Sequence, residues 1–143
     1  FSRELISAHH KLSGAIRGRR TMSGSSIERI AGLDKYSREL AHLAPDAIKA
    51  FGTLSREAQK SGALDHKVKE LMALAIGVAM RCDGCIAYHA RNSLRAGATR
   101  QEIAETLAVA VQMGGGPAMV HAADALRAFD EFAAAAAPPS ATA

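Results

Sequence analysis

The stretch Leu71–Met80 reads L-M-A-L-A-I-G-V-A-M and is the longest apolar run in the chain. A helix at a protein surface carries one apolar stripe, whereas a helix formed by this run is apolar on every side. We therefore expect the run to lie in the middle of a helical bundle or beneath a subunit contact. Gly77 interrupts it at a helix-propensity cost of about 1 kcal/mol, which predicts the close approach of another helix at this point. With ten residues, the run is too short to span a membrane.

Capping and breaking residues on both sides of this run predict further helices and no strands. Asp65 is a suitable N-cap for the helix that contains the run and continues to Met80. The Thr99-x-x-Glu102 pattern is a capping box that starts a later helix. The segment 114–117, G-G-G-P, should break the chain and restart it, and it lacks the lysine and hydroxyl residue of a phosphate-binding loop. The sequence predicts an all-α bundle of about six helices, of which the first four cover approximately 34–43, 45–60, 65–80 and 85–96.

The net charge of +4 is confined to the start of the chain. Residues 1–20 contain five basic side chains and one acidic side chain, so the remaining 13 basic and 13 acidic side chains sum to zero. We therefore expect no nucleic-acid partner, since such a surface needs a basic stripe interleaved with aromatic residues. Residues 1–21 are expected to be a disordered or appended leader, with a basic targeting segment as the alternative. Residues 22–133 should form one helical domain, and 134–143 a disordered low-complexity tail.

Both cysteines of the chain lie in the segment 81–89, R-C-D-G-C-I-A-Y-H, where a new helix should begin. A helix N-terminus favours thiolate, the nucleophilic form of cysteine. His89 follows Cys85 by four residues, and helical side chains lean toward the N-terminus, so its imidazole should lie over Cys85 as a base beside a nucleophile. Glu70 directly precedes the apolar run and should lie at the rim of the core or partly inside it. These features favour a redox dithiol.

Two other interpretations of the cysteine pair remain open. Buried free cysteines are common in protein cores and need no chemical role. A structural zinc site needs four ligands, so His66 or His121 would have to join His89 and both cysteines. Two cysteines are too few for a disulfide scaffold, and a reducing cytoplasm is the expected location.

The two sulfurs are not equivalent, and the residues alone do not decide which is the nucleophile. Cys82 lies nearer the helix N-terminus and should be the more acidic thiol by the dipole argument. The register of His89 instead favours Cys85. Asp83 lies between the two cysteines, where its negative charge should oppose thiolate formation.

Glu70, Cys82, Cys85 and His89 fill the pattern E-x11-C-x2-C-x3-H. This pattern resembles the core motif of the AhpD-like alkylhydroperoxidases, which belong to the carboxymuconolactone decarboxylase superfamily. The flanking sequence is similar to the family core over about residues 46–130. The resemblance implies a compact, all-helical AhpD-like bundle that assembles as a homo-oligomer, either a trimer or a hexamer.

The resemblance also implies a thiol-dependent alkylhydroperoxidase that uses no cofactor and no metal. Cys85 would attack the hydroperoxide as the peroxidatic sulfur, and Cys82 would resolve the sulfenic acid as an intramolecular disulfide. His89, with Glu70 through a bound water, would relay the protons. A lipoyl-bearing or thioredoxin-like dithiol protein would reduce the disulfide. The alternatives are a lyase of the carboxymuconolactone decarboxylase type, which does not depend on a C-x-x-C pair, and a non-catalytic redox-sensing helical oligomer.

Tyr88 and His121 are secondary candidates for the site. Tyr88 adjoins His89 and could donate a hydrogen bond there, although a packing role is the simpler interpretation. His121 lies on the helix after the glycine run and could approach the site or a subunit boundary.

Overall fold

The computed structural model describes residues 24–137, so the predicted leader and residues 138–143 of the predicted tail lie outside the described residues. The described residues 24–137 contain helices and no strand, which confirms the predicted all-α class. The elements are α2 (Ser26–Leu43), α3 (Pro45–Gln59), α4 (His66–Ala79), α5 (Asp83–Arg95) and α6 (Arg100–Ala136). Among them, no helix combines the length and the apolar character that crossing a membrane requires.

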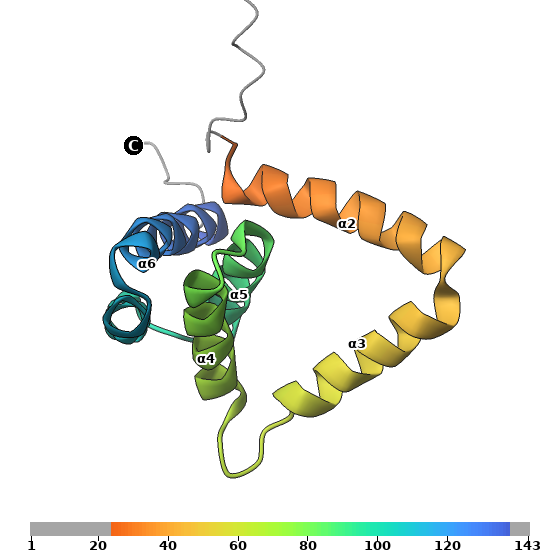
Figure 1. The fold of residues 1–143 in the computed structure, drawn as a ribbon, viewed down its shortest axis with the longest axis horizontal. Coiled ribbons are helices and arrows are strands. Elements are labelled where there is room, and N and C mark those ends of the chain that lie inside the picture. Colours follow the sequence, from red (N-terminus) through yellow and green to blue (C-terminus); the bar gives the residue numbers. More distant parts are fainter. Residues whose placement is uncertain (1–23, 138–143) are drawn as a thin grey trace, which may run out of the picture.

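Helices α4, α5 and α6 pack together, and α2 and α3 form a bent arm that leaves this bundle and returns to it before α4 (Figure 1). The arm is attached at its start, where the Ser26 backbone N–H donates to the Glu131 carboxylate of α6 at 2.7 Å. Helix α3 contains no buried residue, and its Phe51 and Leu54 are 66% and 65% exposed. The arm therefore presents apolar side chains that the bundle of the same chain does not cover.

The apolar run is buried on one side only. Leu74 and Val78 are fully buried in the core. Their neighbours there come from α5 and from both halves of α6. Met72, Ile76 and Met80, spaced four residues apart on the opposite side of α4, are 49%, 55% and 73% exposed. One face of the run therefore lies in the core, whereas a subunit contact over the exposed face stays a prediction.

The predicted helix starts at Asp65 and Thr99 are confirmed. The Asp65 carboxylate accepts the Val68 N–H at 2.8 Å, and Thr99 forms the complete capping box with Glu102. The expected start of the first helix near residue 34 was wrong, because α2 begins at Ser26 with a Ser25–Glu28 capping box. Helix α5 also begins earlier than expected, since Cys82 is its N-cap.

The glycine run breaks α6 as predicted. Gly115 has φ 66° and ψ −157°, so the 37 residues of α6 form two helical rods that meet there (Figure 1). A Cβ on the preceding Gly114 would lie 2.6 Å from the Ala118 Cβ. The break thus requires glycine for both conformation and close packing. The five elements contain six helical rods, and the last continues to Ala136, beyond the expected domain end at residue 133.

Candidate functional site

The turn between α4 and α5 fixes the position of the C-x-x-C pair. The Gly77 carbonyl accepts the Cys82 N–H at 3.0 Å, and the Val78 carbonyl accepts the Arg81 N–H at 3.1 Å. Arg81 adopts a left-handed conformation with φ 57°. This is the Schellman pattern of a helix C-terminus, here with arginine where glycine is usual. One helix therefore ends and the next begins within three residues, which places Cys82 at the N-cap of α5.

Gly77 lets α5 approach α4 at the cysteines, as the sequence predicted. A Cβ on Gly77 would lie 3.2 Å from the Cys85 Cβ and 3.5 Å from the Ile86 nitrogen. The first distance is tighter than nine in ten real Cβ contacts, whereas the second is an ordinary van der Waals contact, so a side chain at this position would require the start of α5 to shift by a few tenths of an ångström. Gly77 is therefore part of the support of the dithiol.

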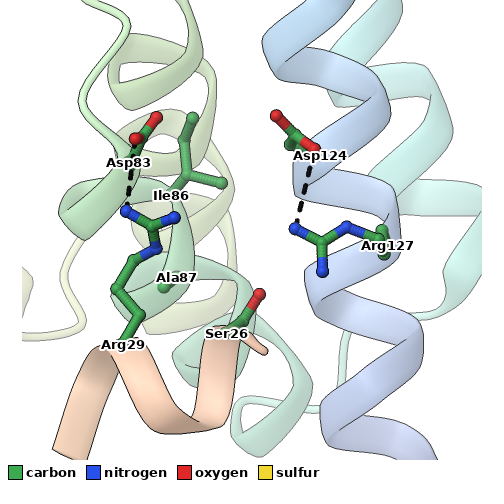
Figure 2. Close-up of a pocket in the computed structure, with 7 residues that line it drawn as sticks. All are labelled: Ser26, Arg29, Asp83, Ile86, Ala87, Asp124 and Arg127. Carbon is green, nitrogen blue, oxygen red and sulfur yellow. Dashed lines mark hydrogen bonds and ion pairs between the residues drawn. The ribbon is translucent and has the colours of Figure 1, made fainter. Parts of the chain in front are cut away.

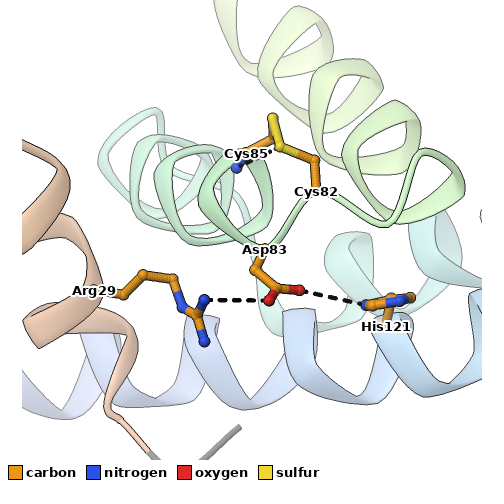
Figure 3. The surroundings of a disulfide bond; sticks show 5 residues. All are labelled: Arg29, Cys82, Asp83, Cys85 and His121. Atoms are coloured by element: carbon orange, nitrogen blue, oxygen red, sulfur yellow. Dashed lines mark hydrogen bonds and ion pairs between the residues drawn. A yellow bond between two sulfur atoms is a disulfide. The ribbon is translucent and has the colours of Figure 1, made fainter. Parts of the chain in front are cut away.

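Cys82 and Cys85 are joined as a disulfide, with their Cα atoms 5.2 Å apart (Figure 3). The Cys82 sulfur also accepts the Cys85 backbone N–H at 3.3 Å. The structure therefore represents the oxidised form of the pair, with the first sulfur at the amino end of α5. That N–H would stabilise a thiolate on Cys82 after reduction.

Glu70 and His89 are in direct contact. The Glu70 side chain is 4% exposed, and its Oε2 lies 2.7 Å from His89 Nδ1. An ionised carboxylate can only accept, so Nδ1 carries a proton and Nε2 remains available to a substrate or a sulfur. No water fits between these two atoms, in contrast to the predicted water-linked arrangement. Among the described residues, no hydrogen bond joins His89 to either sulfur of this oxidised form.

Two further polar side chains face Glu70, and neither was predicted to do so. The Asn92 amide donates to Oε1 across 3.4 Å, and His66 Nε2 lies 3.8 Å from the same oxygen. His66 Nδ1 lies 3.0 Å from the Gln59 carbonyl, which can only accept, so Nδ1 carries a proton. The sequence signals were the helical spacings, since Asn92 is three residues after His89 and His66 is four before Glu70.

Asp83 points away from the disulfide, toward α2 and α6 (Figure 3). Its Oδ2 lies 3.2 Å from the Arg29 guanidinium, and its Oδ1 lies 3.7 Å from His121 Nδ1. His121 therefore approaches the C-x-x-C segment through Asp83. The role of Arg29 was missed because 54 residues separate it from Asp83.

A cavity of about 20 Å³ lies beside this group, between the first turns of α2 and α5 and the second rod of α6 (Figure 2). Such a volume accommodates one water molecule and no larger ligand. Across it from Asp83, Arg127 lies 3.6 Å from Asp124. The cavity lining is formed by Ser26, Arg29, Asp83, Ile86, Ala87, Asp124 and Arg127.

Tyr88 does not join the Glu70 group. Its hydroxyl donates to the Asp34 carboxylate of α2, and the Arg91 guanidinium lies 5.0 Å from its ring centre. The hydrogen bond to Asp34, together with burial, raises the pKa of Tyr88 above its ordinary value. Tyr88 thus fastens α5 to the arm.

The described residues contain no group of three or more His, Cys, Asp or Glu side chains that could hold a metal ion. The two histidines considered as additional zinc ligands, His66 and His121, face Glu70 and Asp83 respectively. A zinc ligand set with the cysteines is therefore not formed in this part of the chain.

Residues 45–128 match the sequence model of the carboxymuconolactone decarboxylase family. The chain is 38% identical over 102 residues to an uncharacterized protein of Cupriavidus necator, covering 71% of this chain and 90% of that protein. A solved carboxymuconolactone decarboxylase family protein of Legionella pneumophila superposes with a TM-score of 0.74 at 41% identity, over 75% of this chain and 96% of that one. A family protein of Thermotoga maritima, named for a possible involvement in antioxidative response, gives 0.68 at 30% identity, over 74% and 91%.

Proposed function

Because the chain belongs to the carboxymuconolactone decarboxylase family, we propose that it is a thiol-dependent hydroperoxidase of the AhpD type. The observation that carries this proposal is the contact at 2.7 Å between the buried Glu70 and the half-buried His89, on the helices that position the C-x-x-C disulfide. A general base oriented by a carboxylate is the arrangement that activates a nucleophilic sulfur.

The proposed reaction starts from the reduced pair. The Cys85 thiolate attacks one oxygen of the hydroperoxide ROOH, the O–O bond breaks, and the alkoxide takes a proton to leave as ROH. Cys85 is then a sulfenic acid. The Cys82 thiol attacks this sulfur, which releases water and forms the Cys82–Cys85 disulfide. One hydroperoxide is thereby reduced by two electrons, and one dithiol is oxidised.

Glu70 and His89 supply the proton transfers in this scheme. Since Nδ1 of His89 faces the carboxylate, Nε2 is the nitrogen that takes the proton from Cys85 and returns it to the departing alkoxide. The negative charge of Glu70 stabilises the imidazolium formed in between. Asn92 holds the second carboxylate oxygen and thereby helps to fix its orientation.

A second dithiol must return the disulfide to the reduced state. Its thiolate attacks one sulfur to give a mixed disulfide, and its second thiol then releases the reduced protein. A lipoyl-bearing or thioredoxin-like protein has the required chemistry, and a reducing cytoplasm is where such a cycle can run.

We also propose that the protein works as a trimer or a hexamer. The exposed stripe Met72, Ile76 and Met80 and the exposed Phe51 and Leu54 of the arm are large apolar side chains that a second copy would cover. Sedimentation velocity on the full chain tests this proposal, and a monomer at micromolar concentration would refute it.

The function is tested by thiol titration of the reduced protein before and after one equivalent of cumene hydroperoxide, with Cys82→Ser and Cys85→Ser alongside. We expect the wild type to lose two thiols per chain. Cys85→Ser should consume no peroxide, whereas Cys82→Ser should react once and stop as a trappable sulfenic acid. The proposal would be refuted if the two thiols reacted with the peroxide no faster than free cysteine does.

The same variants separate the two alternatives. A lyase would keep its turnover of lactone acids in both serine variants. A redox-sensing oligomer would form the disulfide without catalytic turnover, and its sedimentation coefficient would change on oxidation.

A further inference from the structure

The charge of Asp83 raises a question that the proposed reaction leaves open. A carboxylate between two cysteines should oppose formation of the thiolate on which the reaction depends. We propose that Arg29, assisted by His121, is a positioning residue that holds the Asp83 carboxylate away from the sulfurs and thereby sets how readily the dithiol ionises. This inference rests on the proposed function only in that the reduced pair is the reactive form.

The geometry shows a carboxylate held from two sides. Arg29, on α2, places its Nη1 3.2 Å from Asp83 Oδ2. His121, on α6, places its Nδ1 3.7 Å from Asp83 Oδ1. The Arg29 hydrogen bond fixes the direction of the Asp83 side chain. His121 Nδ1 makes no hydrogen bond, and it attracts the other carboxylate oxygen only when the imidazole is protonated. Figure 3 shows the result, in which Asp83 extends from α5 on the side opposite to the disulfide.

The other charged groups that face Asp83 largely cancel. Besides Arg29 from α2 and His121 from α6, they are Asp124 and Arg127 across the small cavity. Asp124 and Arg127 pair with each other at 3.6 Å (Figure 2). Arg127 also pairs with Glu131. Arg29 is therefore the permanent positive charge committed to Asp83, whereas His121 contributes a charge only when its imidazole is protonated.

Two effects of Arg29 follow, and they can be separated. Its positive charge offsets the negative charge of Asp83 at the sulfurs. Its hydrogen bond also prevents the carboxylate from rotating toward them. In a variant without the Asp83 carboxylate, only the positive charge of Arg29 still acts on the sulfurs, because no carboxylate is left to restrain. Removal of Arg29 should therefore raise the thiol pKa more when Asp83 is present than when it is absent.

The experiment measures the pH midpoint of thiolate formation in the reduced full chain by ultraviolet absorbance. Asp83→Asn should lower this midpoint and Arg29→Gln should raise it, each by about 0.5–1 pH unit. The double variant should lie between Asp83→Asn and the wild type, because Arg29→Gln should raise the midpoint by less in the Asp83→Asn background than in the wild type. His121→Gln should act as Arg29→Gln does, but less strongly.

Two matched controls accompany these variants. Arg29→Lys keeps the charge and should stay within about 0.3 pH unit of the wild type. Arg100→Gln removes an arginine that pairs with Asp130 instead and should leave the midpoint unchanged. Thermal unfolding checks that each variant is folded, and if Arg29→Gln is not, the Asp83→Asn and His121→Gln shifts decide.

An unchanged midpoint in Asp83→Asn would overturn the inference, because the carboxylate would then not reach the sulfurs electrostatically. Equal effects of Arg29→Gln in both backgrounds would also overturn it, since Arg29 would act by charge alone. Peroxide turnover is measured separately. Shifted midpoints in a protein without turnover would support this inference and refute the proposed function, whereas turnover with unshifted midpoints would do the reverse.

Discussion

Replacement of Glu70 by glutamine tests the proposed proton relay most directly. The Glu70 residue is 3% exposed, and its two oxygens face His89 at 2.7 Å and Asn92 at 3.4 Å. Glutamine has nearly the same shape, and its amide oxygen can still accept the His89 Nδ1–H. The substitution therefore removes the negative charge and, because the glutamine NH2 group replaces Oε1, also the long hydrogen bond from Asn92.

The size of the effect follows from this geometry. A hydrogen bond to a charged group contributes about 1.5–3 kcal/mol, compared with about 1 kcal/mol for a neutral one. The difference of roughly 1–2 kcal/mol applies when His89 carries the thiol proton, and it corresponds to a decrease of about 5- to 30-fold in peroxide turnover. His89→Gln removes the base itself and should cost about 10²–10⁴-fold. Because the two residues act as one unit, Glu70→Gln/His89→Gln should lose no more than His89→Gln alone.

The assay is steady-state peroxide consumption coupled to a small dithiol reductant, with thermal unfolding of each variant. Glu102→Gln is the matched control, since Glu102 is a carboxylate paired with Lys67 at 2.6 Å, away from the cysteines. Its turnover should equal that of the wild type. A folded Glu70→Gln variant with wild-type turnover would refute the relay, and multiplicative losses in the double variant would show that Glu70 and His89 act independently.

Three further predictions concern stability. Arg81→Gly should raise the free energy of unfolding by about 1 kcal/mol in urea denaturation, because Arg81 occupies the left-handed region and glycine does so without penalty; a destabilised variant would contradict this. Leu74→Ala should lower it by about 2–5 kcal/mol, since Leu74 is fully buried between three helices, and a loss below 1 kcal/mol would show that the site collapses. The hydrogen bond from Lys67, aided by the Thr99 N–H, lowers the pKa of Glu102 from 4.5 to about 2. A lowered pKa contributes stability above pH 4.5 that is lost as the pH falls toward about 2. In Lys67→Gln, the free energy of unfolding should therefore depend less steeply on pH over this acid range, and an unchanged slope would refute the assignment.

Local signals in the sequence predicted most of the helical framework. Asp65 and Thr99 marked helix starts because their side chains cap neighbouring N–H groups, which is a property of a few consecutive residues. Gly77 marked a close helix approach, and the glycine run marked the break in α6. The start of α2 was missed although Ser25 and Glu28 carry the same capping signal as Thr99 and Glu102.

The candidate site was predictable in part for the same reason. Glu70, Cys82, Cys85 and His89 lie on two consecutive helices joined by a short turn, so spacing alone brings them near one another. The role of each in catalysis stays a prediction until the variants are measured. The direct contact between Glu70 and His89, in place of a water-linked one, depends on how closely α5 approaches α4, and no local pattern encodes that distance.

The sequence by itself determined the all-α class, the cysteine pair at a helix start and the placement of Glu70 and His89 on the two helices that flank it, because these follow from the helical repeat and from capping chemistry. Only the tertiary structure decided where the charge of Asp83 points. Its partners Arg29 and His121 come from helices distant in sequence, and a carboxylate turns to whichever cation packing places beside it. Long-range electrostatics of this kind is set by the arrangement of helices in space, which residue spacing along the chain does not specify.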